Sequence, residues 1–388
     1  MTPGARIAAA IEVLDRVIAG ASAERVLTTW ARQNRFAGSG DRSVVRDHVF
    51  DALRRLHSAA AEGGAMTGRG VMLGLLRQQG IAPETLFTGE GHAPPPPGPD
   101  DPPGAAPHDP DVALDCPAWL AAQLRHDLGA DFAPVMARLR TRAPVFLRVN
   151  TALASLSEVQ AMLVGEGIET RPSGLAPTAL EVLSNPRRLQ NSGPYRAGLV
   201  ELQDAASQAI SDAVPLGAGQ RVLDLCAGGG GKTLALAARC PEAVFHAHDI
   251  DSARMGDLPA RAQRAGVRVQ VIAPADLGGA GLFDVVVIDA PCSGSGAWRR
   301  SPQGKWLLTA ARLAGLQQSQ DALLHHAAAL AGPDGVLAYM TCSLLDTENA
   351  ASVRRFLSAD TGWRLSSERT LTPLDGGDGF FVAILARC

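Results

Sequence analysis

The residues of this 388-residue chain with the clearest chemical potential follow short apolar segments. Four glycines, Gly228–Gly231, come after one such segment and are followed by Lys232 and Thr233. Glycines let a backbone approach a ligand closely, and a helix that begins after them presents free N–H groups. Two thiols, Cys292 in "DAPCSGSG" and Cys342 in "YMTCS", follow later apolar segments. This pattern suggests a nucleotide-type loop beside a cysteine nucleophile with an accessory thiol.

Two kinds of binding loop contain such a glycine run. A phosphate-binding loop has a glycine, four residues and then Gly-Lys-Ser/Thr. Counting back from Gly231 places Cys226 at the first glycine position, so this motif misses by one residue. The Asp of "VVVIDAP", which would hold magnesium in a phosphate site, still supports that alternative. The other possibility is a nucleoside-cofactor loop made of Cys226, Ala227, the four glycines and Lys232, and the rest of the chain has to decide between the two.

Acidic residues stand at the ends of successive expected strands. Asp249 closes the second strand, Asp276 follows the third and Asp289 ends the fourth. Carboxylates at such positions accept hydrogen bonds from ribose hydroxyls, so we expect all three in the cofactor site. The alternative is that each carboxylate caps a following helix.

The elements that must hold these residues alternate strand and helix. We expect strands in "RVLDLC", "AVFHAHDI", "VRVQVIA", "FDVVVIDAP", "VLAYMTCS" and "GFFVAILAR", with helices between most of them. This order is typical of a doubly wound, mainly parallel sheet, so we expect an α/β, Rossmann-like domain over 201–388. Ligands bind at the carboxyl ends of the strands in such sheets.

Three further segments precede this domain. The helical spacing of isoleucines and leucines predicts an all-helical domain over 1–87. Residues 88–113 include "APPPPGPDDPPGAAPHDPD", with nine prolines, and we expect a stiff, solvated, acidic linker there. Residues 114–200 combine helical patterns with the strand-like "PVFLRVN" and "ALEVL", which predicts a small α+β module.

The chain carries a formal net charge of −3 that is unevenly distributed. Residues 1–87 hold 11 Arg, no Lys and 8 acids, a balance of +3, whereas 88–113 hold five acids and no Lys or Arg. Charge alone therefore neither establishes nor excludes RNA binding.

Six cysteines without metal-ligand spacing predict reduced thiols and no metal site. The charged N-terminal segment is unlike a signal peptide, and no apolar run is long enough to span a membrane, so we expect a cytoplasmic protein with no membrane partner.

Several motifs together resemble a known family. "DLCAGGGGKT", "DAPCSGSGAWRRSPQGKW" and "YMTCSLLDTENA", in this order and before a terminal "DGGDGFFVA", are similar to the Sun/RsmB (NOL1/NOP2/Sun) family of S-adenosylmethionine-dependent RNA cytosine-5 methyltransferases. The similarity extends to "FLRVN" and "GLVELQDAASQ", and more faintly to the N-terminal domain, which resembles the NusB-like RNA-binding module of the RsmB-like branch.

The resemblance implies S-adenosylmethionine as cofactor, an RRM-like α+β module, and ribosomal RNA of the small subunit as the partner of a monomeric enzyme. A transfer RNA substrate is an alternative, and so is a catalytically silent RNA-binding assembly factor of the same fold. A nucleotide hydrolase is a third possibility, which Cys226 disfavours.

The resemblance also implies roles for four residues. Carbon 5 of cytosine is a poor nucleophile, so a thiolate must first add to carbon 6. By resemblance Cys342 is that nucleophile and Cys292 assists release of the methylated RNA, although the sequence alone would not choose between the two. Asp289 would hydrogen-bond or protonate ring nitrogen 3. Lys232 would lower the pKa of a nearby thiol or orient the base.

The chain departs from the family pattern at three places. The family usually has Ala-Pro-Gly-Gly at 228–231, Asp at Gln303 and commonly a second Glu at Ala350. Without the proline the unbound loop has more conformations, so we expect modestly weaker cofactor binding.

Seven further residues are candidates for RNA contacts. We expect phosphate contacts from Arg148, Asn150, Arg299, Arg300 and Lys305. Trp298 and Trp306 would stack on bases or anchor their loop to the core, and we favour anchoring for Trp306.

Overall fold

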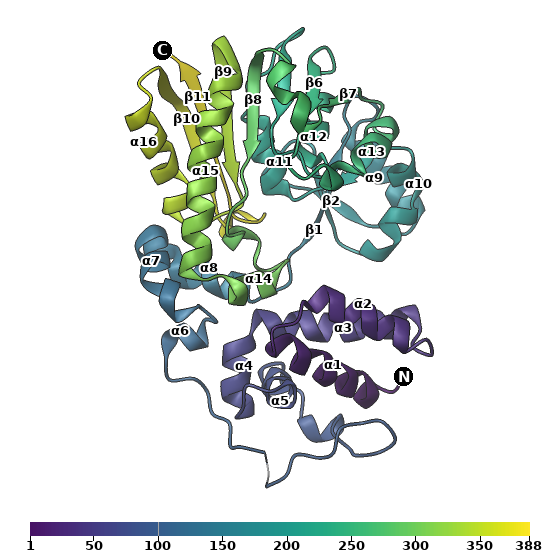
Figure 1. The fold of residues 1–388 in the computed structure, drawn as a ribbon. Helices are drawn as coiled ribbons and strands as arrows, with labels where there is room; N and C mark the ends of the chain where they lie inside the picture. Colours follow the sequence, from purple (N-terminus) through teal and green to yellow (C-terminus); the bar gives the residue numbers. More distant parts are fainter. Residues whose placement is uncertain (100) are drawn as a thin grey trace. The chain divides into compact units, whose positions relative to one another are not determined.

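The computed structural model describes residues 1–99 and 101–388, which form two compact units (Figure 1). The first unit comprises Met1–Arg142 together with Trp298–Leu307, and the second comprises Ala143–Ala297 and Leu308–Cys388. The segment Trp298–Leu307 therefore leaves the expected Rossmann-like domain and packs with the N-terminal helices. The expected boundaries at 87, 113 and 200 stay predictions.

The first unit is helical, as the spacing of its apolar residues predicts. Its helices are α1 (Pro3–Ile18), α2 (Ala23–Gln33), α3 (Ser39–Arg54), α4 (Leu56–Gly63), α5 (Gly68–Gln78), η1 (Pro83–Thr85), α6 (Pro110–Ala113), α7 (Ala118–Leu128), η2 (Gly129–Asp131), α8 (Phe132–Leu139) and α14 (Pro302–Leu307). Thr2 and Thr67 cap α1 and α5 through their side chains. Residues of α1 to α5 form one aliphatic core that includes Leu14, Val49 and Leu75.

The described part of the proline-rich segment packs against these helices. Arg69 forms an ion pair of 2.6 Å with Asp101 and also donates to the carbonyls of Pro95 and Pro96. The N–H of Ala105 donates to Ala61 at 3.1 Å. Most described residues of the segment are exposed, so the expected solvated linker stays a prediction, but these hydrogen bonds hold its backbone to the helices. Proline lacks an N–H, but its carbonyl still accepts hydrogen bonds from a neighbouring arginine.

The second unit begins with a small antiparallel sheet. Its elements are β1 (Val145–Val149), α9 (Leu156–Gly165), β2 (Thr170–Pro172), β3 (Ala179–Val182), η3 (Pro186–Asn191), α10 (Gly193–Arg196) and β4 (Val200–Leu202). The strand order is β2-β3-β1-β4, and every pair is antiparallel. This order and the succession of strands and helices are those of a ferredoxin-like fold, which confirms the expected α+β module.

A seven-stranded sheet forms the rest of the second unit. Its strands are β5 (Arg221–Asp224), β6 (Val244–Ala247), β7 (Val269–Val271), β8 (Phe283–Asp289), β9 (Ala331–Thr341), β10 (Trp363–Leu371) and β11 (Phe380–Arg387). They lie in the order β10-β11-β9-β8-β5-β6-β7, with β5 to β9 parallel and β11 antiparallel to both of its neighbours. The expected Rossmann-like class is confirmed. The connections reverse direction between β5 and β8, and ligands bind at such a switch point.

Helices cover both faces of this sheet. Val285 and Val287 of β8 pack in the core that includes α11 (Ala205–Asp212) and α12 (Gly231–Arg239). Val286 and Ile288 pack in the opposite core with α15 (Ala310–Leu330) and α16 (Ala350–Ala359), and Figure 1 shows α15 running along β8 and β9. The remaining short elements are α13 (Leu258–Arg264), η4 (Ser252–Met255), η5 (Pro274–Gly279), η6 (Ser295–Ala297), η7 (Asp346–Glu348) and η8 (Pro373–Asp375).

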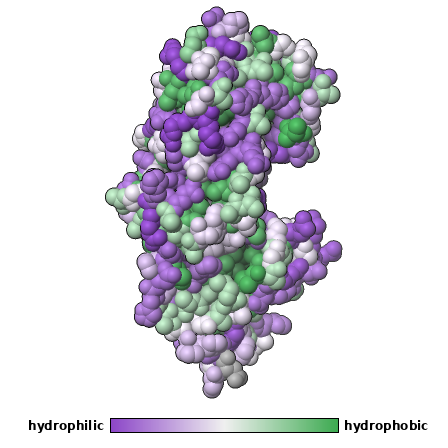
Figure 2. Space-filling view, turned by 60° about the vertical axis from the view of Figure 1, so that its left-hand side comes forward, coloured by the Kyte–Doolittle hydropathy of each residue, from purple (hydrophilic) through white to green (hydrophobic). Residues whose placement is uncertain are grey.

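The surface mixes polar and apolar residues. Figure 2 shows a face on which hydrophilic residues surround smaller groups of hydrophobic ones. Among the described residues, no helix is both long and apolar enough to cross a membrane.

Candidate active site

The glycine loop lies at the switch point of the sheet, between the end of β5 and the start of α12. Gly228 and Gly230 have φ values of +49° and +77°, a left-handed conformation that favours glycine. A Cβ on Gly230 would lie 2.2 Å from Cδ1 of Leu258 in α13. At these two positions, the path of the loop and its close packing explain why the sequence has glycine.

Asp249 lies against this loop. Its carboxylate is 1% exposed, and Oδ2 accepts hydrogen bonds from the N–H of Gly228 at 3.0 Å and from Arg254 at 2.9 Å. Oδ1 accepts from the N–H of Asp251, and Asp251 itself caps η4. The carboxylate of Asp249 therefore faces the glycine loop. Asp276 is exposed in the first turn of η5, and its role in the site stays a prediction.

Lys232 and Asp289 form an ion pair at the same edge of the sheet. The Nζ atom of Lys232 lies 2.6 Å from Oδ2 of Asp289, where β8 ends. Burial alone would lower the pKa of Lys232, but the charge and hydrogen bond of Asp289 outweigh it and raise the pKa above its usual value, with a smaller contribution from Cys342. Lys232 therefore stays charged at neutral pH.

Asp224 is a second buried acid at this edge. Its Oδ2 accepts a hydrogen bond of 2.6 Å from the hydroxyl of Thr233. Burial raises its pKa to about 6, the hydrogen bond from Thr233 opposes this, and the nearby charge of Asp289 adds to it. Ionisation of Asp224 is therefore disfavoured in the folded protein. Burial also raises the pKa of the Cys226 thiol to about 12, which makes this thiol unreactive.

The two thiols at 292 and 342 meet. Their sulfur atoms are 3.4 Å apart, and both side chains are partly buried. The hydrogen bond between the thiols, together with burial, holds the pKa of Cys292 well above its usual range. The Gly296 N–H donates to the carbonyl of Cys342 at 3.0 Å, and the Gly379 N–H donates to Gly296 at 2.9 Å. A Cβ on Gly296 would lie 2.1 Å from the Gly379 carbonyl, so the terminal "DGGDGF" segment packs directly on the Cys292 loop.

Glu348 connects the loops of the two cysteines, and sequence analysis did not single it out. The residue is 0% exposed, and its carboxylate accepts from the N–H and hydroxyl of Ser293, which follows Cys292, and from the hydroxyl of Ser343, which follows Cys342. Gln320 of α15 donates to the same carboxylate at 3.0 Å. A buried charge requires such partners. In the sequence, the one sign of this role is an acidic residue a few positions after "TCS", in a segment whose residues are mostly buried.

Two of the expected phosphate contacts are buried instead. Arg148 donates to the carbonyl of Gly231 at 2.8 Å and to Gln203, and Asn150 donates to the carbonyl of Ala265 at 2.9 Å. Both side chains are almost fully buried because β1 lies inside the second unit. The expectation of phosphate contacts from Arg148 and Asn150 is therefore wrong.

The segment Trp298–Leu307 corrects two more of these expectations. Arg299 and Lys305 are each 1% exposed, and Lys305 donates to the carbonyl of Arg54 at 3.2 Å. Neither side chain is available to a phosphate group, whereas Arg300 is exposed.

Trp306 anchors this segment, as expected, by donating from its ring N–H to Leu53 at 2.7 Å. Trp298 is also buried, which excludes base stacking in this conformation. Gln303, which departs from the family pattern, exchanges hydrogen bonds with the backbone of Ala21 and Ala23.

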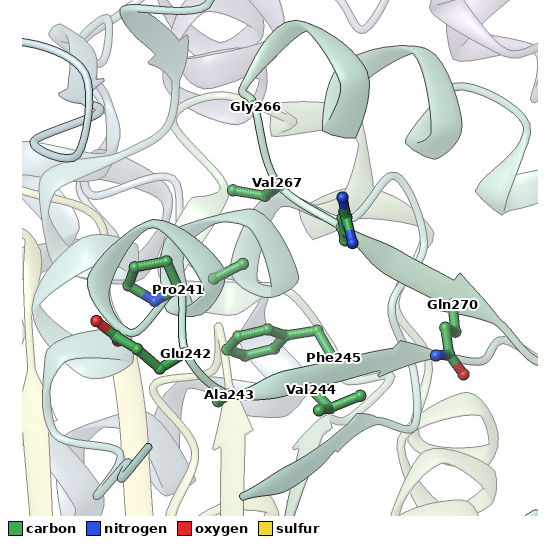
Figure 3. Close-up of a pocket in the computed structure, with 10 residues that line it drawn as sticks. Pro241, Glu242, Ala243, Val244, Phe245, Gly266, Val267 and Gln270 are labelled. Atoms are coloured by element: carbon green, nitrogen blue, oxygen red, sulfur yellow. The ribbon is translucent and has the colours of Figure 1, made fainter. Parts of the chain in front are cut away.

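A separate hollow of about 520 Å³ lies at the other ends of the strands. Figure 3 shows Phe245 and Val244 of β6 at its floor, with Pro241, Glu242, Val267 and Gln270 around them. These residues stand at the amino ends of β6 and β7, whereas the glycine loop follows the carboxyl end of β5. Among the described residues, no group of three or more His, Cys, Asp or Glu side chains is placed to hold a metal ion.

Two family models match this chain. Residues 215–386 match the model described as 16S rRNA methyltransferase RsmB/F. Residues 116–189 match the model described as the ferredoxin-like domain of RsmF/B-like methyltransferases. The two matches cover the large sheet with the cysteines and most of the small sheet.

A curated relative and two solved structures are similar to the chain. The relative is "Ribosomal RNA small subunit methyltransferase B" of Vibrio cholerae, 33% identical over 283 residues, which are 70% of this chain and 65% of that protein. The chain thus matches about two thirds of the length of such relatives. The structure titled "Crystal Structure of PH0851" has a TM-score of 0.76 and 22% identity and covers 99% of both chains. The structure of NSun6 from Pyrococcus horikoshii with SFG has a TM-score of 0.63 and 18% identity over 70% of this chain and 98% of that one. These two likenesses show the fold.

Proposed function

Since the chain belongs to the Sun/RsmB family of methyltransferases, we propose that it transfers a methyl group from S-adenosylmethionine to carbon 5 of a cytosine in RNA. The observation that carries this proposal is the meeting of two thiols, 3.4 Å apart, beside the Lys232–Asp289 pair and the glycine loop. Such a set provides a nucleophile, a second thiol and a polar group for a ring nitrogen.

The residues around the loop fit a nucleoside cofactor. Asp249 presents a buried carboxylate to the loop, and a carboxylate accepts about four hydrogen bonds. One of its three donors is Arg254, whose side chain is 58% exposed and can give way to ribose hydroxyls. Ile250, 84% exposed, offers an apolar surface next to it. When bound, S-adenosylmethionine supplies an electrophilic methyl group. We assign its site to Cys226, Ala227, the four glycines, Lys232, Asp249, Asp276 and Asp289.

We assign the covalent step to Cys342. Cys342 gives up its thiol proton and its thiolate adds to carbon 6 of cytosine, while nitrogen 3 takes up one proton through the carboxyl group of Asp289, which neutralises the charge that develops in the ring. After carbon 5 has taken the methyl group, a water molecule takes the proton of carbon 5, and the electrons of that bond re-form the double bond between carbons 5 and 6. The bond between sulfur and carbon 6 then breaks, which restores the thiolate, and nitrogen 3 returns its proton to Asp289. Lys232 holds the carboxylate of Asp289 in place through its ion pair.

The second thiol has a different task in our proposal. Its sulfur lies 3.4 Å from that of Cys342, and the hydrogen bond between the thiols, together with burial, holds the pKa of Cys292 well above its usual range. On the family resemblance, we assign Cys292 to the release of the methylated RNA.

We further propose that the RNA is ribosomal, as the name of the curated relative says of that protein. The target base must leave its stack to reach a partly buried thiol, so the RNA is single-stranded locally or the base is flipped. The expected monomeric state, the cytoplasmic location and the NusB-like likeness of the helical unit stay predictions.

Bisulfite mapping of total RNA from cells with and without this gene tests the proposal. We expect one or a few cytosines that resist bisulfite conversion in wild-type cells to be converted in the deletion strain. The RNA that contains them shows whether the substrate is ribosomal or transfer RNA. An unchanged map would favour the silent assembly factor. A melting temperature raised by ATP and not by S-adenosylmethionine would favour the nucleotide hydrolase.

A further inference from the structure

Two arginines from elements outside the glycine loop donate hydrogen bonds to carbonyl groups of the loop. Arg261 of α13 donates to the carbonyl of Gly229. Arg148 of β1 donates to the carbonyl of Gly231 at 2.8 Å. A loop with four glycines loses much backbone entropy when it is ordered, so hydrogen bonds to its carbonyls limit the conformations it can adopt.

Glu201 sets the position of one of these arginines. It lies on β4, directly opposite Arg148 of β1 in the strand register, and its side chain is almost fully buried. Its Oε2 accepts from Arg261 at 2.9 Å, and its other oxygen accepts from Arg264. Arg261 thus spans from the buried carboxylate to the loop carbonyl, and its planar fork of N–H groups fits both acceptors.

Arg264 provides an internal comparison. It pairs with the same carboxylate and lies over the ring of Tyr195, with its guanidinium carbon 4.6 Å from the ring centroid. Glu201 and Tyr195 both belong to the ferredoxin-like module, whereas Arg261 also donates to the glycine loop. Arg261 and Arg264 both lie on α13 and both pair with Glu201, but they differ in their contact with the glycine loop.

We propose that Arg261 and Arg148 are positioning residues for the cofactor loop, and that strands β1 and β4 of the ferredoxin-like module are thereby part of the S-adenosylmethionine site. This inference rests on the proposed function. It assigns the module a role in cofactor binding that is separate from any contact with RNA. The arginines act through the loop backbone, so their loss changes cofactor affinity more than the rate of the chemical step.

Calorimetric titration of the full-length protein with S-adenosylhomocysteine tests this. We expect Arg261→Ala to weaken binding about tenfold, as loss of a hydrogen bond from a charged group does, and Arg264→Ala to change it by less than about threefold. Arg261→Lys keeps one charged donor and restores part of the affinity. In a methylation assay, Arg261→Ala raises KM for S-adenosylmethionine and leaves kcat nearly unchanged.

Several outcomes would overturn the inference. Equal losses in Arg261→Ala and Arg264→Ala would show that the effect comes from packing around Glu201 and not from the loop. Unchanged affinity in Arg261→Ala would show that the loop needs no such support. Should Arg261→Ala fail to fold, Arg148→Met removes the donor to the Gly231 carbonyl and gives the same test there, and unchanged affinity and KM in that variant are the contradicting result. Failure of the wild-type protein to bind S-adenosylhomocysteine would instead contradict the proposed function.

Discussion

The thiol pair and the glycine loop lie at the same edge of one sheet, yet they are held in different ways. The cysteine loops are joined by Glu348, Ser295 and Ser343, each 0% exposed, through a network of side-chain hydrogen bonds. The glycine loop is held through its backbone, by the buried Asp249 and Arg148 and by the partly exposed Arg261. The thiols that we propose for catalysis are therefore fixed by buried side chains, whereas the proposed cofactor loop is held at its backbone and keeps more room to adjust.

The largest effect is expected at the thiol pair. Cys342→Ala removes the sulfur to which we assign the bond with carbon 6, so we expect methyl transfer to fall by at least about a thousandfold. The stability loss is small, on the order of 1 kcal/mol, because one partly buried sulfur is removed. Incorporation of labelled methyl groups into RNA and the melting temperature measure the two effects. Retained turnover would place the nucleophile elsewhere.

The next largest effect is expected at Glu348. Glu348→Gln keeps the shape but replaces a charged acceptor, so the hydrogen bonds to Ser293 and Ser343 weaken and the thiols lose their alignment. We expect kcat to fall about tenfold to a hundredfold with unchanged affinity for S-adenosylhomocysteine. Glu368→Gln, on the exposed strand β10, is the matched control and leaves both quantities unchanged. Equal kcat values for the two variants would contradict the positioning role of Glu348.

A smaller effect, confined to binding, is expected at Asp249. Asp249→Ala removes the acceptor for ribose hydroxyls, which costs about 1–3 kcal/mol in affinity for S-adenosylhomocysteine. Calorimetric titration measures it. Asp251→Ala, which removes only the cap of η4, is the control and keeps the affinity. Unchanged affinity in Asp249→Ala would show that the carboxylate supports the glycine loop but does not bind the cofactor.

The smallest effect is a change of stability with pH at Asp224. Its folded-state pKa of about 6 lies above the ordinary value of 3.8, so the folded protein binds more protons between these values. The free energy of unfolding therefore falls as pH rises through this window, by on the order of 1 kcal/mol between about pH 4.5 and 6. Asp224→Asn cannot titrate and should lack this slope in thermal melts. Identical slopes would show that Asp224 is ionised in the fold.

The sequence predicted the site residues that follow buried strands. Periodicity located β5, β6, β8 and β9, and parallel strands carry their following residues to one edge, so Lys232, Asp249 and Asp289 could be placed there before the structure was known. Strand β10 was missed because "WRLSSERTL" is mostly exposed and polar and shows no apolar alternation. Strands β2 and β4 are too short to give a signal.

The sequence could not show which residues far apart in the chain contact one another. Arg148 and Lys305 looked like surface cations, and only the fold shows that they are buried by elements far away in the chain. The segment Trp298–Leu307 likewise has no local sign that its tryptophans and Gln303 belong with the N-terminal helices. Glu348 was overlooked because its partners follow two cysteines on separate loops.

In the proposed mechanism, Cys342 forms the covalent bond and Cys292 assists release of the product. RNA that contains 5-fluorocytosine tests it most directly, because fluorine at carbon 5 blocks the final elimination. In a denaturing gel we expect wild-type protein to form a slow-migrating adduct with this RNA and Cys342→Ala to form none. On unmodified RNA, Cys292→Ala should accumulate an adduct that wild type releases. An adduct in Cys342→Ala and none in Cys292→Ala would contradict the account and make Cys292 the nucleophile.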